Sequence, residues 1–383
     1  MSEFTTRKIT DRAGTGAPSF TYGLNSGGSD SGLIGKAYTS SGTEPSSPAN
    51  GDLWYDSTND KLYYYVAGEF KQITHENPVT AWYGARGLFA GGGYPNSNVI
   101  DYITIASSGN ATDFGDLTVA RDPAVAGASN GTRAIFAGGR LDSSPFRSNV
   151  IDYVTTATTG NATDFGDCTT TLGYHHAVSN GVLGLILGGD AAATLSRTVQ
   201  YVTIETTGNA TAFSSTVTQG TVQGCGCSDG TYSVSHAGKY YNASDLLQSA
   251  SNILYYMTIA TSGDTTDFGD LSYTDSTGQY NTAATSDTTR GLFCGGQRTT
   301  GSNAIHYVTI QTPANSTDFG DLTQNTRDHA AVSDATYAVF GGNSTGTSNV
   351  MSSVTIQTAA NATDFGDLTS GRYDLAAASG SAS

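Results

Sequence analysis

The stretch Asn110-Ala111-Thr112-Asp113-Phe114-Gly115-Asp116 decides the fold, because the same seven residues return along the chain. Identical copies stand at 161–167 and 361–367, close variants at 264–270 and 315–321, and a degenerate copy at 209–213. Their phenylalanines lie 46 to 55 residues apart. A near-constant spacing of this size predicts one supersecondary unit that is repeated six times.

Each unit has the pattern of a small antiparallel sheet. In one unit, small apolar residues at 124–128 precede an Asn-Gly turn, and residues 133–137 alternate as a strand before a double glycine. Residues 149–155 alternate again, and a second turn leads into a short strand at 163–168. Four short strands with turn residues between them predict one four-stranded sheet per unit.

The two ends of the repeat array complete each other. Residues 372–383 match only a first strand, and residues 86–92 match a second strand with no first strand before it. Pairing the two segments closes the array and leaves no open edge for other chains. The sequence therefore predicts an all-β fold, with a six-bladed β-propeller at 79–383 that is closed by its N- and C-terminal strands.

Three features of each unit carry a resemblance to a known repeat. The double glycine Gly138-Gly139, the later Tyr153 and the aromatic Phe165, with their equivalents over 84–383, resemble the kelch repeat family. Phe stands here where kelch units usually carry Trp. The resemblance implies a kelch-like propeller and little about function, because such propellers serve both as enzymes and as binding modules.

The first eighty residues differ from the array. Residues 1–33 are polar and rich in Gly and Ser, which predicts an extended arm that orders on a partner. Residues 34–78 predict a small β meander with aromatic cross-strand packing. Within it, GDLWYD at 51–56 and LYYYVAGEF at 62–70 look like a module of bacteriophage tail and fibre proteins.

That resemblance implies that the chain is a virion protein whose residues 1–78 attach to other virion proteins. The basic residues of the first dozen suit docking on an acidic surface. The predicted attachment residues are Arg7, Lys8, Arg12, Trp54 and Tyr55. We expect a homo-oligomer in the particle, made in the host cytoplasm and located in the tail or fibre.

Composition excludes several classes of partner. The chain has 383 residues and a formal net charge of −16, whereas a nucleic-acid partner would require a basic face. No apolar run reaches the roughly 18 residues that span a membrane, and the first residues lack the apolar core of a secretion signal. The sequence predicts neither a nucleic-acid partner nor membrane insertion.

Motifs that suggest chemistry have structural explanations. Asp-Phe-Gly occurs without the other kinase motifs, and an Asp pair such as Asp113 and Asp116 supplies too few ligands for calcium. The Asn-Ala-Thr triplets match a glycosylation sequon, but their place in the repeat favours a turn. The four cysteines predict free, buried thiols. Because no motif with a mechanism is present, the sequence predicts no enzyme, no metal and no cofactor.

The loops of the repeats can be compared with each other inside the one chain. The turns between first and second strands and between third and fourth strands are near copies, whereas the remaining loops differ in every unit and open on the opposite face. Those loops carry Arg and Tyr, the residue types that most often supply binding energy. The predicted partner-binding residues are Arg140, Phe146, Arg147, Tyr174, Arg197, Lys239, Tyr240, Tyr241, Tyr273, Arg298, Arg372 and Tyr373.

Alternatives stay open at this stage. Some of these arginines, and Arg121 and Arg327 with them, could only fix the start of an inner strand. The first functional hypothesis is display of a face that recognises a host glycan or surface protein, with the unit at 217–260 as its centre. The second is a purely structural tail or head protein, and the third is a carbohydrate-active enzyme.

Overall fold

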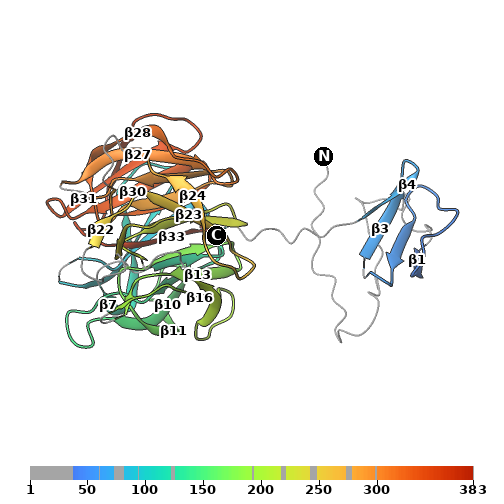
Figure 1. Cartoon of the computed structure of the whole chain (residues 1–383), viewed down its shortest axis with the longest axis horizontal. Coiled ribbons are helices and arrows are strands. Elements are labelled where there is room, and N and C mark those ends of the chain that lie inside the picture. Colours follow the sequence, from blue (N-terminus) through green and yellow to red (C-terminus); the bar gives the residue numbers. More distant parts are fainter. Residues whose placement is uncertain are drawn as a thin grey trace. The chain divides into compact units, whose positions relative to one another are not determined.

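The protein contains only strands in the part that the structure describes. This computed structural model describes residues 38–59, 61–72, 82–93, 95–121, 126–191, 194–216, 221–241, 248–272, 278–297 and 300–382. The chain separates into two compact units, 1–77 and 78–383, both visible in Figure 1. The predicted all-β class is confirmed for these residues, among which no helix is long and apolar enough to cross a membrane.

The first unit is a four-stranded sheet in the order β1 (Tyr38–Ser41), β2 (Leu53–Asp56), β3 (Lys61–Val66) and β4 (Glu69–Gln72). The strands β2, β3 and β4 pair antiparallel in sequence order, as the predicted meander requires, and β1 adds a parallel strand beside β2. Aromatic cross-strand packing is present, because Trp54 stacks on its partner Tyr63 with ring centroids 4.8 Å apart. The predicted arm at 1–33 lies outside the described residues.

The second unit contains six four-stranded antiparallel sheets, which we number I to VI. Sheet I joins the two ends of the unit, and each later sheet is continuous in sequence. Their strands, from first to fourth, are β33 (Ala376–Gly380), β5 (Arg86–Ala90), β6 (Ser97–Thr104) and β7 (Thr112–Arg121) in I; β8 (Ala126–Ser129), β9 (Arg133–Ala137), β10 (Ser148–Thr155) and β11 (Thr163–Leu172) in II; β12 (His176–Ser179), β13 (Leu183–Leu187), β16 (Thr198–Thr203) and β17 (Thr211–Thr216) in III; β19 (Cys225–Ser228), β20 (Tyr232–His236), β23 (Ile253–Thr258) and β24 (Thr266–Asp270) in IV; β25 (Ala283–Ser286), β26 (Arg290–Cys294), β27 (Ser302–Thr309) and β28 (Thr317–Thr326) in V; and β29 (Ala330–Ser333), β30 (Tyr337–Asn343), β31 (Ser348–Thr355) and β32 (Thr363–Asp367) in VI.

Short additional strands lie in the loops of sheets III and IV. They are β14 (Asp190–Ala191), β15 (Thr194–Leu195), β18 (Thr221–Val222), β21 (Lys239–Tyr241) and β22 (Gln248–Ala250). The strands β18, β21 and β22 form a separate three-stranded sheet.

The first strands of the six sheets follow one another around a common axis. Each packs beside the first strand of the next sheet, and β33 packs beside both β29 and β8. The strand β33 pairs with β5 from Ala376 opposite Ala90 to Gly380 opposite Arg86, so the predicted pairing of the two chain ends is observed. The arrangement of sheets in Figure 1 is compatible with a propeller.

The first strands have small residues because they crowd together at this axis. A Cβ at Gly127 would lie 2.1 Å from the carbonyl oxygen of Ala377 in the neighbouring first strand. Each first strand also carries one serine near its end. The hydroxyl of Ser179 donates to the carbonyl oxygen of Ser129 at 2.6 Å, and the same bond links Ser286 to Ser228 and Ser333 to Ser286. These bonds hold neighbouring first strands in register.

The repeated motif joins neighbouring sheets. The Asn161 side chain of sheet II accepts from the backbone nitrogen of Asp116 in sheet I at 3.1 Å. Gly115 must be glycine, because its φ is 145° and a Cβ there would lie 2.4 Å from the carbonyl oxygen of Gly160. The equivalent asparagine bonds are made by Asn110, Asn209, Asn315 and Asn361.

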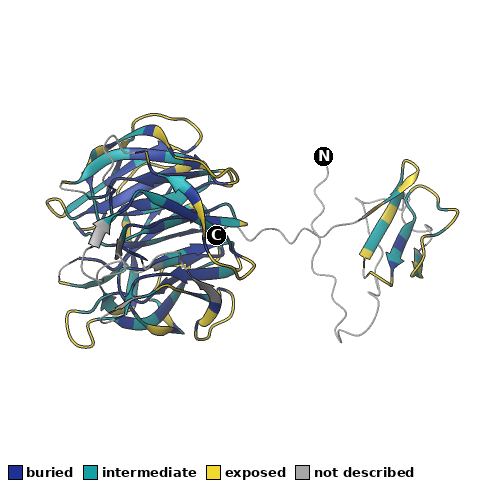
Figure 2. Ribbon diagram, viewed as in Figure 1, coloured by how far each residue is buried: buried dark blue, intermediate teal, exposed yellow. Residues whose placement is uncertain are grey.

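The hydrophobic core lies between adjacent sheets. Phe114 of the motif is 2% exposed and packs with Leu88 of its own sheet and Phe136 of sheet II. Figure 2 shows the buried residues along the strands and the exposed residues at the loops. The four cysteines are free and buried, as predicted.

Candidate functional site

The variable loops lie at one end of the sheets and the uniform turns at the other. In sheet II the turns at 130–132 and 156–162 are adjacent, because the nitrogen of Thr156 donates to the carbonyl oxygen of Thr132 at 2.8 Å. The loop at 138–147 and the connection at 173–175 open at the opposite ends of the same strands. We call these the uniform-turn face and the variable-loop face.

A pair of arginines marks the variable-loop face beside sheets II and III. Arg140 donates to the hydroxyl of Tyr174 at 2.6 Å and lies over its ring at 5.3 Å. Arg147 forms two bonds with the carboxylate of Asp190, at 2.9 and 2.5 Å. Hydrogen bonding to Asp190 raises the pKa of Arg147, so this guanidinium stays charged. Arg140 is therefore the better placed of the two to contact a partner, because its neighbour is neutral.

Among the described residues, Phe146 is the most exposed large apolar side chain on this face. It is 54% exposed and has a left-handed backbone with φ of 64°. That conformation is uncommon for a bulky residue. The loop therefore holds an aromatic ring in water at a strained position, which is expected of a contact residue.

A second cation–aromatic pair lies on the side of sheets IV and V. The Lys239 ammonium is 3.7 Å from the centroid of the Tyr280 ring. Burial lowers the pKa of Lys239 and the carboxylate of Asp328 opposes this change. The sequence places Tyr280 among the tyrosines of the variable loops, although it is not one of the predicted partner-binding residues.

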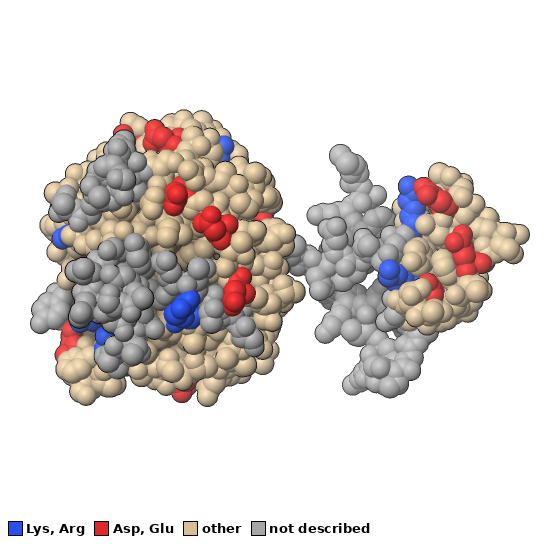
Figure 3. Space-filling view, in the orientation of Figure 1, with Lys and Arg blue, Asp and Glu red and all other residues tan. Residues whose placement is uncertain are grey.

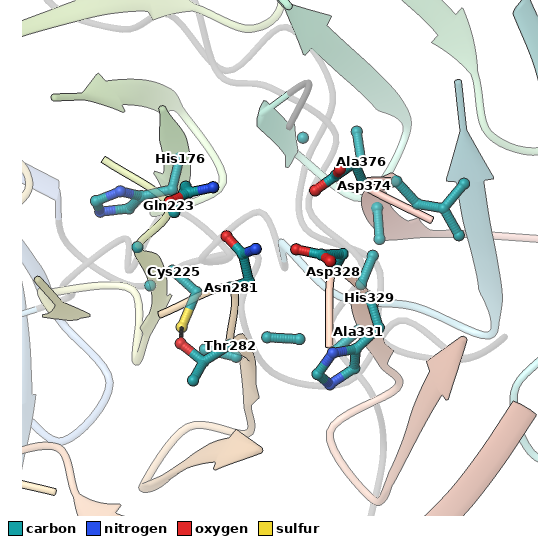
Figure 4. Close-up of a pocket in the computed structure, with 18 of the residues that line it drawn as sticks. His176, Gln223, Cys225, Asn281, Thr282, Asp328, His329, Ala331, Asp374 and Ala376 are labelled. Atoms are coloured by element: carbon teal, nitrogen blue, oxygen red, sulfur yellow. Dashed lines mark hydrogen bonds between the residues drawn. The ribbon is translucent and has the colours of Figure 1, made fainter. Parts of the chain in front are cut away.

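A pocket of about 140 Å³ opens where the six first strands begin. Figure 4 shows the side chains of Gln223, Asn281, Asp328 and Asp374 pointing toward one common space. We call this space the axial pocket. Each of these residues, and Tyr174, has a left-handed backbone with φ of 55° to 58°, and each stands just before a first strand.

Backbone hydrogen bonds connect these five residues into an arc. The nitrogen of each donates to the carbonyl oxygen of its predecessor, from Gln223 to Tyr174 at 2.9 Å through to Asp374 to Asp328 at 2.6 Å. Sequence reasoning missed the arc. The available signal was a residue other than glycine two positions before each of these first strands, and three of the five residues are Asn or Asp.

Two sequence predictions of contact residues are wrong. Arg372 is 4% exposed and donates to the Asp101 carboxylate at 2.6 Å and to the carbonyl oxygens of Gly91 and Val99. The alternative, that such arginines fix an inner strand, holds for Arg372 and for Arg121, which forms the equivalent buried ion pair with Asp152. A guanidinium buried to this extent is not accessible to a receptor.

Trp54 is the second correction. Its indole is 7% exposed, and its Nε1 donates to the carbonyl oxygen of Ser41 at 3.1 Å. It forms the core of the small sheet and does not present a contact surface. Tyr55, its neighbour, is partly exposed.

The remaining predicted residues divide into two groups. Arg197 is exposed and Tyr373 is partly exposed, both at the variable-loop face. Arg7, Lys8, Arg12, Tyr273, Arg298 and the side chains of Tyr240 and Tyr241 lie outside the described residues. Figure 3 shows few Lys and Arg side chains on the view presented, with Asp and Glu in small separate groups.

The buried titratable groups near the axis are inert. Burial lowers the pKa of His329 to about 3 and that of His236 to about 4. It raises the pKa of the Cys225 thiol to about 12. Among the described residues no group of three His, Cys, Asp or Glu side chains could hold a metal ion.

A further pocket lies on the uniform-turn face. It measures about 370 Å³ and lies between sheets IV and V, lined by Tyr232, Ile310 and Gln311 among others. In sheets I, II and V an arginine begins the second strand, stacks on a tyrosine and donates to a turn carbonyl of the next sheet. In sheet IV, Tyr232 occupies the position of this arginine. The pocket therefore lies where an arginine side chain fills the space in the other three sheets.

Comparison with known proteins shows the fold and no family. No family model matches the chain, and no curated protein is similar to it. A solved structure described as "Structure of YjhT" is similar with a TM-score of 0.53 and 11% identity, over 68% of this chain and 90% of that chain. At this identity the likeness concerns the fold alone.

Proposed function

We propose that residues 79–383 form a six-bladed, kelch-like β-propeller in a bacteriophage virion protein of the tail or fibre, and that the variable-loop face recognises a host glycan or surface protein. Six four-stranded sheets, the closed sequence of first strands and the similarity to the YjhT structure support the propeller. The phage-type residues 51–56 and 62–70 support the setting.

One observation carries the proposal of recognition. The loops diverge on one face only, and the described chain of the second unit begins at the other face. Trp82 lies against the turn at Gly230, where a Cβ would come within 2.5 Å of the indole. Trp82 also lines a pocket of about 80 Å³ with Ser129 and Ser228 at the uniform-turn end of the first strands.

This placement gives the two faces different roles in the proposal. In the proposal, the variable-loop face contacts the host, and the uniform-turn face is the one at which the described chain of the second unit begins, near Trp82. Divergent loops on a rigid scaffold are where binding sites usually lie. Arg140 with Tyr174, and Lys239 with Tyr280, supply cations beside aromatic rings, which suit an acidic sugar or a protein loop.

The test compares two exposed apolar residues on opposite faces. Particles carrying Phe146→Ala should adsorb less well to host cells, whereas particles carrying Val182→Ala should adsorb normally, because Val182 is 51% exposed at the uniform-turn face. Both variants should melt as the unchanged protein does. If only Val182→Ala lowers adsorption, recognition lies on the uniform-turn face and the proposal is wrong.

A second candidate is a purely structural protein whose propeller packs on other virion proteins. The pocket beside Tyr232 on the uniform-turn face favours it, because a neighbour could fill that pocket. If this candidate is right, Phe146→Ala leaves adsorption unchanged. Particles that are assembled with a protein lacking residues 1–78 then still contain the propeller. The recognition proposal expects those particles to lack it.

A further inference from the structure

The side chains that meet in the axial pocket have the chemistry of a cation site. Gln223, Asn281, Asp328 and Asp374 come from the starts of four consecutive sheets and reach one space (Figure 4). All four carry side-chain oxygen, and two are carboxylates. Oxygen ligands of this kind are those that hard cations prefer.

An orphaned oxygen points to a ligand. The Asp328 side chain is 10% exposed, and its Oδ1 is buried with no hydrogen-bond partner in the protein. Its Oδ2 accepts from the Ser344 hydroxyl and lies 3.7 Å from Nε of Arg327. A buried polar atom without a partner is uncommon, and an ion or a water is the usual explanation.

A second carboxyl group lies beside that of Asp328. Asp374 stands just before the first strand of the next sheet, and its side chain interacts with that of Asp328. Two carboxyl groups from neighbouring sheets therefore line the same pocket.

The other side chains around the pocket exclude soft metals. His329 directs Nε2 to the sulfur of Cys294 at 3.6 Å. The Cys225 thiol lies 3.1 Å from the Thr282 hydroxyl and stays protonated, because burial raises its pKa to about 12. Zinc and copper need imidazole or thiolate ligands, so the available donors favour calcium.

Size also fits calcium. The axial pocket measures about 140 Å³, which holds an ion and several waters at about 30 Å³ each. Two carboxylates and two amides provide four to six oxygens, and waters complete the six to eight that calcium takes. Magnesium demands a tighter octahedron than side chains from four separate sheets supply.

We propose that the axial pocket binds one calcium ion through the side-chain oxygens of Asp328, Asp374, Asn281 and Gln223. The arc of left-handed residues places these four side chains at one level of the axis. The ion supplies the partner that Oδ1 of Asp328 lacks in the protein. The site is independent of the proposed recognition of a host.

The experiment is calcium titration of the full chain after removal of metal with EDTA. Calorimetry at pH 7 should give one calcium per chain in the range of about 0.1–1 mM, with weaker binding of magnesium. Calcium should also raise the melting temperature. Asp374→Asn should weaken calcium binding about tenfold or more, because site charge sets calcium affinity.

Controls keep the test decisive. Asp364→Asn removes the same charge from an exposed position at the uniform-turn face and should leave calcium binding unchanged. Asn281→Ala removes a ligand without changing charge and should also weaken binding. No binding at about 10 mM calcium, or equal affinity in Asp374→Asn, Asn281→Ala and the unchanged protein, would overturn the proposal.

Discussion

The buried pair of Arg372 and Asp101 holds the two ends of the second unit together, and its removal should destabilise the protein strongly. Arg372 precedes the C-terminal strand β33, whereas Asp101 lies on β6 of the N-terminal part of the same sheet. Their side chains are 5% and 0% exposed. Breaking one partner of such a pair costs about 3–5 kcal/mol, because the other charge stays buried.

The structure sets where in that range the effect of Arg372→Met should fall. Asp101 keeps two bonds from Thr369, one from its hydroxyl at 2.6 Å and one from its backbone nitrogen at 3.2 Å. The carbonyl oxygens of Gly91 and Val99 lose their Arg372 donor, at about 1 kcal/mol each. We expect a loss of about 4 kcal/mol, or roughly 6 °C in the melting temperature of a domain this large, because the entropy of unfolding is about 2.1 cal/mol/K per residue.

The junction of sheets V and VI has neutral residues at the equivalent positions. Thr326 of β28 corresponds to Arg372, and Ser352 of β31 corresponds to Asp101. The hydroxyls of Thr323 and Ser352 are 2.6 Å apart, which corresponds to the bond between Thr369 and Asp101. The double variant Arg372→Thr with Asp101→Ser should therefore regain at least half of the stability that Arg372→Thr alone loses.

The assay is thermal and urea unfolding of the full chain, with amide exchange at 376–380 as a local measure. Faster exchange in β33 than in β29 would locate the loss at the closure. The reasoning fails if Arg372→Met melts within about 1 °C of the unchanged protein. It also fails if the double variant melts below both single variants.

Three further predictions concern the repeat, acid stability and the missing arginine. Gly320→Ala should destabilise by several kcal/mol, because its Cβ would lie 2.6 Å from Ala360 backbone atoms, whereas Gly263→Ala, with nothing within 4 Å, should be nearly neutral by urea unfolding. Acid should destabilise the fold, since burial lowers the pKa of His175 and His236 to about 4 and of His176 and His329 to about 3. The unfolded chain then binds more protons than the folded chain between about pH 6.5 and 4. Each histidine therefore contributes stability that is complete above pH 6.5 and falls by about 1.4 kcal/mol per pH unit below it. In urea titrations at several pH values, the free energy of unfolding of His175→Leu should fall less steeply with pH than that of the unchanged protein, and an equal dependence on pH would contradict this. Tyr232→Arg should raise the melting temperature by a few degrees, because an arginine there can donate to the carbonyl of Ile310 as Arg290 does to that of Ile356; a drop in melting temperature would count against the interpretation of the pocket.

The repeat alone determined the sheets of the second unit. Strand positions follow from alternation and turn residues, which act over neighbouring residues, so 133–137 and 163–168 could be predicted without knowing their partners. The split unit at the ends predicted the pairing of β33 with β5, because a first strand was missing at one end and present at the other. The prediction that the four cysteines are free, buried thiols was also correct.

The role of individual arginines was decided only by the tertiary structure. Arg147 and Arg372 both lie in variable loops, yet Arg147 is partly exposed and Arg372 is buried against Asp101. Burial depends on which carboxylate faces the guanidinium across two sheets, and Asp101 is 271 residues away in sequence. Trp54 was misassigned for a similar reason, since its stacking on Tyr63 depends on the register of β2 and β3.

The axial pocket also required the tertiary structure. Each of its residues is ordinary within its own loop, and the repeat offers no reason to link Asn281 with Asp374. They become neighbours because the first strands of all the sheets converge on one axis, which brings residues about fifty positions apart within hydrogen-bonding distance. A sequence pattern determines the local strand and turn, whereas convergence of side chains from separate sheets is a property of the closed packing.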